Sequence, residues 1–255
     1  MECAQKLLPI KLFTLSPTIL LLSIFFFFIQ NCYAENSIRL NTTGQPPLNS
    51  KDKNGFMDKV AQQAFAQINI RLDTTQLPAE RGLINANSGL EDGEMSRIDG
   101  LTKAYPNLIP VPEKIMDWEF VAFSKKNIVL DKGWSSLANH SIALINGWKI
   151  LENNVPTSSD IIKVKNPTQL FTLLERNRAD IVLFEKWGGL ALIKKKNLKN
   201  IHLLSPILAK REMHIYLHKK HNKLIGPLSK ALVEMKSNGQ YQNIYNEILN
   251  PLLSQ

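Results

Sequence analysis

The sequence predicts an α/β protein whose two halves are joined by strands and not by a flexible linker. Short apolar strands alternate with helices over most of the chain, which is typical of a sheet covered on both faces. Two uninterrupted strand-like runs, residues 118–123 (WEFVAF) and 213–217 (MHIYL), are available to cross between the halves. The sequence contains no internal repeat, low-complexity tract or long linker.

In the first half, residues 37–41 (SIRLN) alternate as a strand and end at a proline-rich turn. A helix is predicted from Phe56, because apolar residues then recur every four positions. A second strand begins at residues 70–72. Pro78 suits the first turn of a helix that runs to about residue 87, with Gly89 just beyond its end. Residues 108–111 form a further predicted strand.

The second half repeats this alternation. Strands are predicted at residues 141–145, 161–164 and 181–184, and a short helix is predicted from Trp148. Asn166 and Pro167 begin another helix, because this pair is favoured at a helix start. Helices are also predicted at residues 187–196, across residues 228–235, and at 241–249.

The N-terminus has the pattern of an export signal. Lys6 and Lys11 precede an apolar run, residues 18–29, and small residues follow near Ala34. This pattern predicts a signal peptide over residues 1–34, with cleavage after Ala34 and a periplasmic product of about 220 residues. An uncleaved anchor and lipid attachment at Cys32 are the alternatives.

The cysteines and the charge exclude some classes of protein. Cys3 and Cys32 both lie in the signal region, so the exported chain has no cysteine for disulfides or thiolate metal sites. The net charge of +9 is compatible with an anionic ligand, a membrane surface or nucleic acid. The densest basic runs, at residues 194–199 and 218–223, lack the interleaved aromatic residues of a nucleic-acid platform, so we interpret them as solvated surface.

Residues 76–108 contain an unusual cluster of charge among glycines and asparagines. The cluster comprises Arg81, Asp92, Glu94 and Arg97. Charged side chains are rarely buried without a partner, so such a stretch inside a fold is either solvated surface or a polar site.

The order of motifs along the chain resembles bacterial extracellular solute-binding protein family 3, which includes polar amino acid receptors of ABC transporters. The matching residues are Pro46-Pro47 after the first strand, residues 54–58 (NGFMD), residues 178–182 (RADIV), and residues 235–239 (MKSNG) followed by Tyr241. The order of these motifs carries the resemblance, which covers nearly all of the exported chain.

The resemblance implies the type II periplasmic binding protein fold: two α/β lobes, two crossings, and a ligand held in the cleft between the lobes. The first lobe would comprise residues 35–122 and 213–255, and the second residues 123–212. Clefts between lobes commonly bind ligands, and hinge closure is the usual motion.

The resemblance also implies ligand-binding residues in the first lobe. Arg97 is the first candidate, because a guanidinium matches a carboxylate in two places and family members use an arginine in this region. Glu94 stands where the family has a hydroxyl, so an ion pair between Arg97 and Glu94 or Asp92 is the alternative. Arg81 is a further candidate, or else a solvated helix residue.

In the second lobe, Gly147, Trp148 and Lys149 begin a helix where free backbone N–H groups favour an anion. Glu185 stands where amino acid receptors carry an acidic residue for the ligand ammonium. A core aromatic role for Trp148, and a surface group or helix cap at Glu185, are the alternatives. Gln45 replaces an aromatic residue that usually stacks on the ligand, so a stacking wall is missing unless Trp118 or Trp148 supplies it.

These patterns predict a non-enzymatic solute-binding protein that captures a small polar or anionic, amino acid-like solute. An inner-membrane permease or a sensor is the expected partner, and the protein is expected to be a monomer without cofactor, metal or nucleic acid. Two alternatives remain open. One is a dehydratase-like enzyme using Glu94 or Glu185 as acid or base, and the other is an exported sensory or partner-binding protein.

Overall fold

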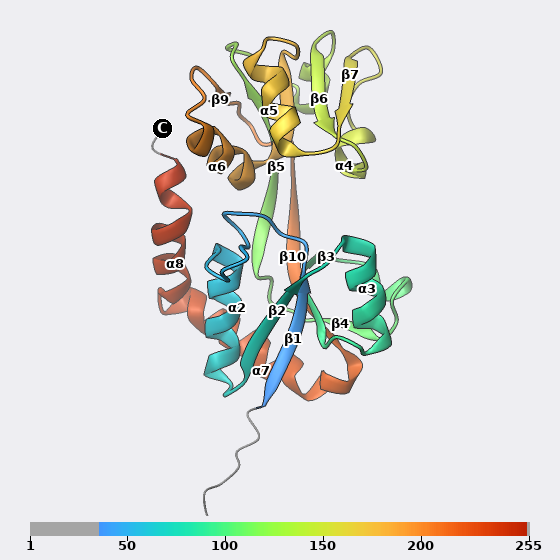
Figure 1. Cartoon of the computed structure of the whole chain (residues 1–255), viewed down its shortest axis with the longest axis vertical. Helices are drawn as coiled ribbons and strands as arrows, with labels where there is room; N and C mark the ends of the chain where they lie inside the picture. The colour runs from blue at the N-terminus through green and yellow to red at the C-terminus, as the bar shows by residue number, and fades with distance from the viewer. Residues whose placement is uncertain (1–35, 254–255) are drawn as a thin grey trace, which may run out of the picture. The chain divides into compact units, whose positions relative to one another are not determined.

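The computed structural model describes residues 36–253, shown in Figure 1. The predicted signal peptide, its cleavage after Ala34 and both cysteines lie outside these residues. Between residues 36 and 253, no helix is both long and apolar enough to cross a membrane.

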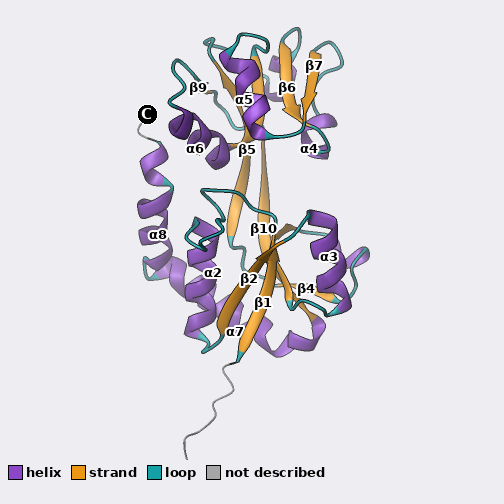
Figure 2. Ribbon diagram, viewed as in Figure 1, coloured by secondary structure: helices purple, strands orange, loops and turns teal. Residues whose placement is uncertain are grey.

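Ten strands form one mixed sheet in the order β2-β1-β3-β10-β5-β8-β6-β7, with β4 paired to β10 and β9 paired to β5. Figure 2 shows these strands in orange, with helices flanking them. The strands are β1 (Ser37–Thr42), β2 (Arg71–Gln76), β3 (Gly93–Ile98), β4 (Leu108–Pro110), β5 (Met116–Ser124), β6 (Ser141–Ile145), β7 (Asp160–Val164), β8 (Ile181–Glu185), β9 (His202–Leu203) and β10 (Ala209–His218).

The helices lie where the apolar periodicity predicts them. They are α2 (Phe56–Gln67), α3 (Ala79–Ser88), α4 (Lys149–Glu152), α5 (Pro167–Glu175), α6 (Lys186–Lys196), α7 (Asn222–Ser237) and α8 (Gln240–Ile248), with 3-10 turns η1 (Leu101–Lys103), η2 (Gly133–Leu137), η3 (Lys219–His221) and η4 (Asn250–Leu252). Two predicted helix ends are confirmed. Gly89 ends α3 in the left-handed conformation, with φ of 83°, and Asn166 caps α5 by accepting from the Gln169 amide.

The two predicted crossings are β5 and β10, and this part of the prediction is confirmed. β10 pairs antiparallel with β3 and β4 of the first group of strands and also with β5, while β5 pairs with β8 of the second group. We call β1–β4 with α2, α3, α7 and α8 the first lobe, and β6–β9 with α4–α6 the second lobe. The predicted boundaries at residues 122 and 213 fall inside β5 and β10.

β3 is the main departure from the predicted elements. No strand is predicted from the sequence within the charged stretch, but Gly93–Ile98 is a strand between β1 and β10. Gly93 is required there, because a Cβ atom would lie 2.0 Å from the Tyr216 carbonyl oxygen. Met95 and Glu94 are almost fully buried, so the strand carries a charge into the interior.

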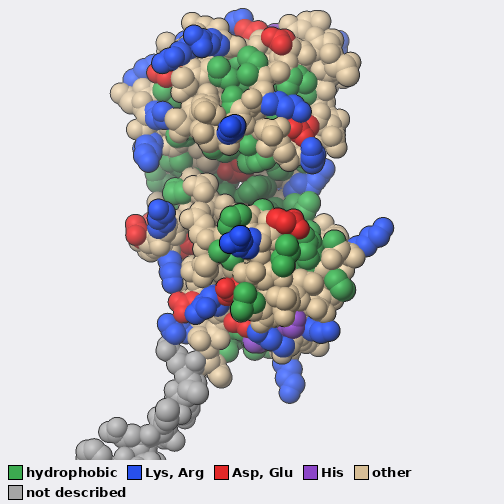
Figure 3. All heavy atoms as spheres, turned by 45° about the vertical axis from the view of Figure 1, so that its right-hand side comes forward, with side chains coloured by type: hydrophobic (Ala, Val, Ile, Leu, Met, Phe, Trp, Pro, Cys, Tyr) green, Lys and Arg blue, Asp and Glu red, His purple; other side chains and the backbone are tan. Residues whose placement is uncertain are grey.

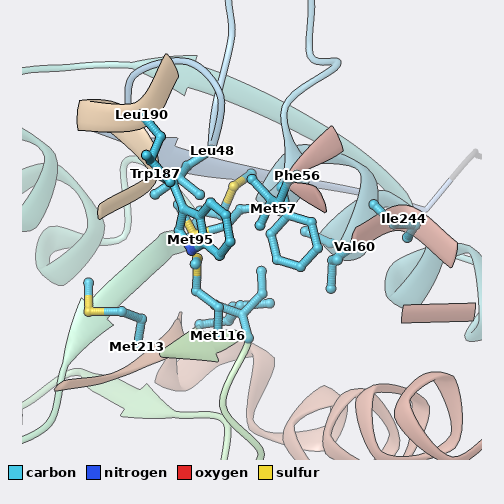
Figure 4. Packing of buried hydrophobic residues seen from close by; sticks show 14 of the residues in the cluster. Leu48, Phe56, Met57, Val60, Met95, Met116, Trp187, Leu190, Met213 and Ile244 are labelled. Atoms are coloured by element: carbon cyan, nitrogen blue, oxygen red, sulfur yellow. The ribbon is translucent and has the colours of Figure 1, made fainter. Parts of the chain in front are cut away.

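The largest hydrophobic cluster contains residues from both lobes. Leu48, Phe56 and Met57 of the first lobe belong to the same buried cluster as Trp187 and Leu190 of α6 (Figure 4). α6 also packs tightly on β5: a Cβ atom at Gly189 would lie 2.3 Å from the ring of Phe123. This packing fixes the position of α6, whose N-terminal end borders the site described next.

Candidate functional site

A cavity of about 500 Å³ lies between the loop after β1 and the second lobe. The first lobe contributes residues 43–46 and Leu48, and the crossing strand β5 contributes Trp118. Figure 3 shows hydrophobic side chains, in green, inside the hollow between the two lobes. The second lobe contributes Trp148, the start of α5 (Asn166, Pro167, Thr168), the end of β8 (Phe184, Glu185) and one side of α6 (Gly188, Ala191, Leu192, Lys195).

The loop after β1 is held in place by a buried carboxylate. Asp58, in the first turn of α2, accepts hydrogen bonds from the Asn49 side chain at 2.8 Å, the Ser50 amide at 2.8 Å and the Gly55 amide at 3.0 Å. Asp58 is 1% exposed, so water cannot take its place as the acceptor for these three donors. The cavity side of the loop, including Gln45, therefore has a defined position.

An aromatic cluster forms one wall of the cavity. The Trp148 ring stacks on Phe184 at 5.0 Å with an interplanar angle of 16°, and lies 6.4 Å from Trp118. Phe120 supports Trp118 and Trp148 from behind in edge-to-face contacts. Trp118 and Trp148 thus both supply aromatic surface to the cavity, on a site where Gln45 offers none.

One donor in this wall is unsatisfied. The Nε1–H of Trp118 is buried and has no hydrogen-bond acceptor among the described residues. A buried donor without an acceptor costs about 1–3 kcal/mol of stability.

Glu185 is the buried carboxyl group of the site. It stands at the end of β8 and caps α6, accepting from the amides of Trp187 at 2.9 Å and Gly188 at 2.7 Å. Burial raises the pKa of Glu185 to about 7, although the two amides favour the charged form. The carboxyl group can therefore change charge near neutral pH.

Among the residues that the structure describes, no basic side chain forms an ion pair with Glu185. Lys186 is next in sequence, but its Nζ donates to Glu119 at 2.7 Å. Lys195, the basic residue of the cavity lining, is ten residues along α6 from Glu185, which separates their Cα atoms by about 15 Å. Glu185 borders the aromatic wall. When it is ionised, its negative charge has no basic side chain paired with it among the described residues.

The structure pairs Arg97 with Glu94. The Arg97 Nε and Nη2 atoms lie 2.9 Å and 2.8 Å from Glu94 Oε2, and Nη2 also donates to the Ala79 carbonyl oxygen at 3.1 Å. Burial raises the pKa of Glu94, and the nearby Arg97 charge opposes that shift. This arrangement matches the alternative in which the two residues neutralise each other.

The other predicted residues lie apart from the cavity lining. Arg81 is exposed on α3. Gly147, with φ of 87°, donates from its amide to Glu152, and Lys149 forms an ion pair with the same carboxylate at 2.7 Å. Of the eight predicted residues, the cavity brings together Gln45, Trp148 and Glu185.

Sequence reasoning missed several lining residues. Phe184 reads in the sequence as an ordinary residue of a buried strand, and Lys195 as part of a solvated basic run. The sequence identifies Asn166 and Thr168 only as part of a helix start. A further signal could have found them, because strand ends and helix starts of α/β folds meet at one edge of the sheet. In the part of the chain that the structure describes, no group of three or more His, Cys, Asp or Glu side chains is placed to hold a metal ion.

Comparisons with known proteins agree on the fold. No family model matches the chain. An uncharacterized protein of Shewanella oneidensis is 25% identical over 199 residues, covering 73% of each chain. An ancestral arginine-binding protein bound to glutamine has a TM-score of 0.65 at 19% identity, covering 84% of this chain and 97% of that one.

A sensor domain is equally similar in structure. A histidine kinase sensor domain with similarity to periplasmic binding proteins has a TM-score of 0.67 at 15% identity, covering 85% of this chain and 97% of that one. At these identities the likeness concerns the fold alone. The chain therefore has the two-lobe fold of periplasmic binding proteins, as the sequence predicts.

Proposed function

We propose that this chain is a periplasmic solute-binding protein that captures a small solute in the cavity between its lobes. The cavity itself is the observation that carries this proposal. It joins residues of both lobes around an aromatic wall and the carboxyl group of Glu185. A concave, mostly apolar site with a few polar groups is typical of small-molecule binding.

The two strands that join the lobes support a closing motion. β5 and β10 are the crossings, and lobes joined in this way commonly close around a ligand by bending at the connecting strands. The similar structure of an arginine-binding protein that holds glutamine supports an amino acid-like or related nitrogen-containing solute. Periplasmic export would follow from the predicted signal peptide.

A thermal-shift screen of the purified exported protein tests the proposal. The panel contains amino acids, amines, organic acids and phosphorylated solutes, and a true ligand raises the unfolding temperature in proportion to the logarithm of its concentration. The proposal fails if no small solute in the panel raises that temperature.

Two tryptophan variants locate the binding site. Trp148→Ala removes a ring that lines the cavity, whereas Trp134→Ala removes a similarly half-buried ring outside the lining. We expect Trp148→Ala to reduce the ligand-induced shift strongly and Trp134→Ala to preserve it. Equal losses in both variants would place binding elsewhere.

Sensing is the second candidate function, favoured by the likeness to a histidine kinase sensor domain. Once a solute is identified, its uptake by cells lacking the protein separates the two roles. Reduced uptake indicates an inner-membrane permease as the partner. Unchanged uptake with a lost transcriptional response indicates a membrane sensor.

A further inference from the structure

We propose that the solute is an organic amine with an apolar or aromatic body and no carboxylate group beside its ammonium group. This inference rests on the proposed function and narrows it to a ligand class. It follows from the charges of the cavity wall: the wall has a place for a cation and none for an anion next to it.

The place for the cation is at Glu185. Its carboxyl group is 4% exposed, lines the cavity, and has backbone amides as its partners in place of a basic side chain. Each carboxylate oxygen can accept more than one hydrogen bond, so both retain capacity for an ammonium donor. The neighbouring rings of Trp148 and Phe184 add a wall that attracts cations and disfavours anions.

An α-amino acid would bring its carboxylate to within two bonds of the carbon that carries the ammonium. Within residues 36–253, no unpaired basic side chain lies at that distance from Glu185. Arg97 is neutralised by Glu94 and lies outside the cavity lining, and Lys186 is paired with Glu119. Lys195 starts about 15 Å away along α6.

The start of α5 is a further electropositive feature of the cavity lining, and it is a weak anion site. Pro167 has no N–H, and the amide of Gln169 already donates to the Asn166 side chain at 2.9 Å. Of the first three helical positions, only the amide of Thr168 remains to face the cavity. A carboxylate placed at the start of α5 would receive few hydrogen bonds, because few backbone amides there are free to donate.

The aromatic wall also constrains the body of the solute. Trp118 and Trp148 offer aromatic surface, which favours a planar or apolar body over a hydrated one. An arylalkylamine meets both conditions, with an ammonium group for Glu185 and an apolar, planar body for the aromatic wall.

The test compares amines with the amino acids from which they differ by one carboxylate. The pairs are tyramine and tyrosine, tryptamine and tryptophan, and agmatine and arginine, titrated by calorimetry at pH 8. We expect the amine of at least one pair to bind, and each amine that binds to do so at least tenfold more tightly than its amino acid.

Two variants check the assigned contacts. Glu185→Gln keeps an oxygen to cap α6 but removes the charge, and should weaken amine binding about tenfold or more. Glu175→Gln removes an exposed carboxylate on α5, outside the lining, and should have no effect.

The possible outcomes separate this inference from the proposed function. If amino acids bind as tightly as their amines or more tightly, the amine assignment is wrong and the solute-binding function stands. The same holds if organic acids or phosphorylated solutes bind and amines do not. If no small solute binds, both proposals fail.

Discussion

Glu94 and Glu185 are buried carboxyl groups that the fold stabilises in different ways. Glu94 is 1% exposed and contacts the guanidinium of Arg97, so its charge is compensated by a neighbouring side chain. Glu185 is 4% exposed and is held by two backbone amides of α6. Backbone dipoles offset less of the desolvation cost than a full opposite charge does, which leaves Glu185 free to respond to a ligand or to pH.

Glu185 should make stability depend on pH. Its pKa is about 7 in the folded protein, above the ordinary value of 4.5. Between these values the unfolded chain loses the proton while the folded protein keeps it, so the free energy of unfolding falls as pH rises from about 4.5 through 7. The loss contributed by this group is on the order of 3 kcal/mol.

Urea denaturation at pH 4.5 and pH 8 measures this contribution. The side chain that Glu185→Gln introduces does not titrate. The free energy of unfolding of the variant, relative to that of the wild type, should therefore rise by roughly 3 kcal/mol between pH 4.5 and pH 8. A difference that stays constant between the two pH values would contradict the raised pKa. Because a cation favours the charged form, amine binding should also strengthen up to about pH 8.

Arg97 should matter for stability. Arg97→Ala leaves the Glu94 carboxylate buried without its counter-charge, and we expect a loss of about 3 kcal/mol in the free energy of unfolding at pH 8. The loss should be smaller at pH 5 than at pH 8, because burial raises the pKa of Glu94 and the variant lacks the Arg97 charge that opposes this shift. Urea denaturation at both pH values measures the effect.

The double variant Arg97→Ala with Glu94→Gln is the control. It should recover part of the lost stability, because no charge is left unpaired. If Arg97→Ala instead abolished ligand binding and left stability unchanged, Arg97 would be a ligand contact and not a structural partner of Glu94.

Residue roles could be predicted from the sequence only where the local structure was also predictable. Glu185 and Trp148 follow apolar strands that are evident in the sequence, so their place at a strand end could be anticipated. The Arg97–Glu94 pair could not be derived from its spacing, because residues three apart in a regular strand point to opposite faces. The register between β10 and β3 is irregular, and this local geometry is invisible in the sequence.

At the scale of elements, periodicity predicted most helices because each buries one apolar stripe. α2 buries Phe56, Val60 and Ala64, as their four-residue spacing predicts. β3 could not be predicted in the same way. Its residues GEMSRI contain one large apolar side chain that is buried, and its place in the sheet depends on pairing with β1 and β10, which are distant in sequence.

The turn between β1 and α2 shows how an element positions the site. We expect Asp58→Ala to lower the free energy of unfolding by about 3 kcal/mol, because the Ser50 and Gly55 amides and the Asn49 side chain lose their acceptor. It should also weaken ligand binding, since the loop that carries Gln45 is no longer anchored. Urea denaturation and calorimetry measure the two effects.

Asp52→Ala is the matched control in the same turn. Asp52 is exposed, and its replacement should change stability by less than about 0.5 kcal/mol. If the two variants behaved alike, the anchoring role of Asp58 would be wrong.

At the scale of the whole molecule, β5 and β10 are not the only links between the lobes. The Trp187 ring of α6 contacts the Tyr245 ring of α8 edge to face at 5.6 Å, and Lys194 donates to the Pro251 carbonyl oxygen at 3.0 Å. Figure 1 shows α6 and α8 on the same side of the crossing strands. The buried cluster that contains Phe56 and Trp187 continues through this contact.

This continuity predicts that the lobes unfold together. All four tryptophans of the chain lie between residues 118 and 187, in β5 and the second lobe, so tryptophan fluorescence reports on that part of the molecule. Far-UV circular dichroism reports on the helices and strands of both lobes. We expect the two signals to give the same urea midpoint, because a shared core makes unfolding a single cooperative transition.

Asp58→Ala makes this test more stringent, because Asp58 lies in the first lobe and the tryptophans report on the second. If the lobes unfold as one unit, the variant lowers the fluorescence midpoint by as much as the circular dichroism midpoint. If the lobes unfold separately, the fluorescence midpoint stays at its wild-type value while the circular dichroism transition broadens or splits. That second result would show that α6 and α8 touch without coupling the two lobes, and that the crossing strands act as a hinge between independent folding units.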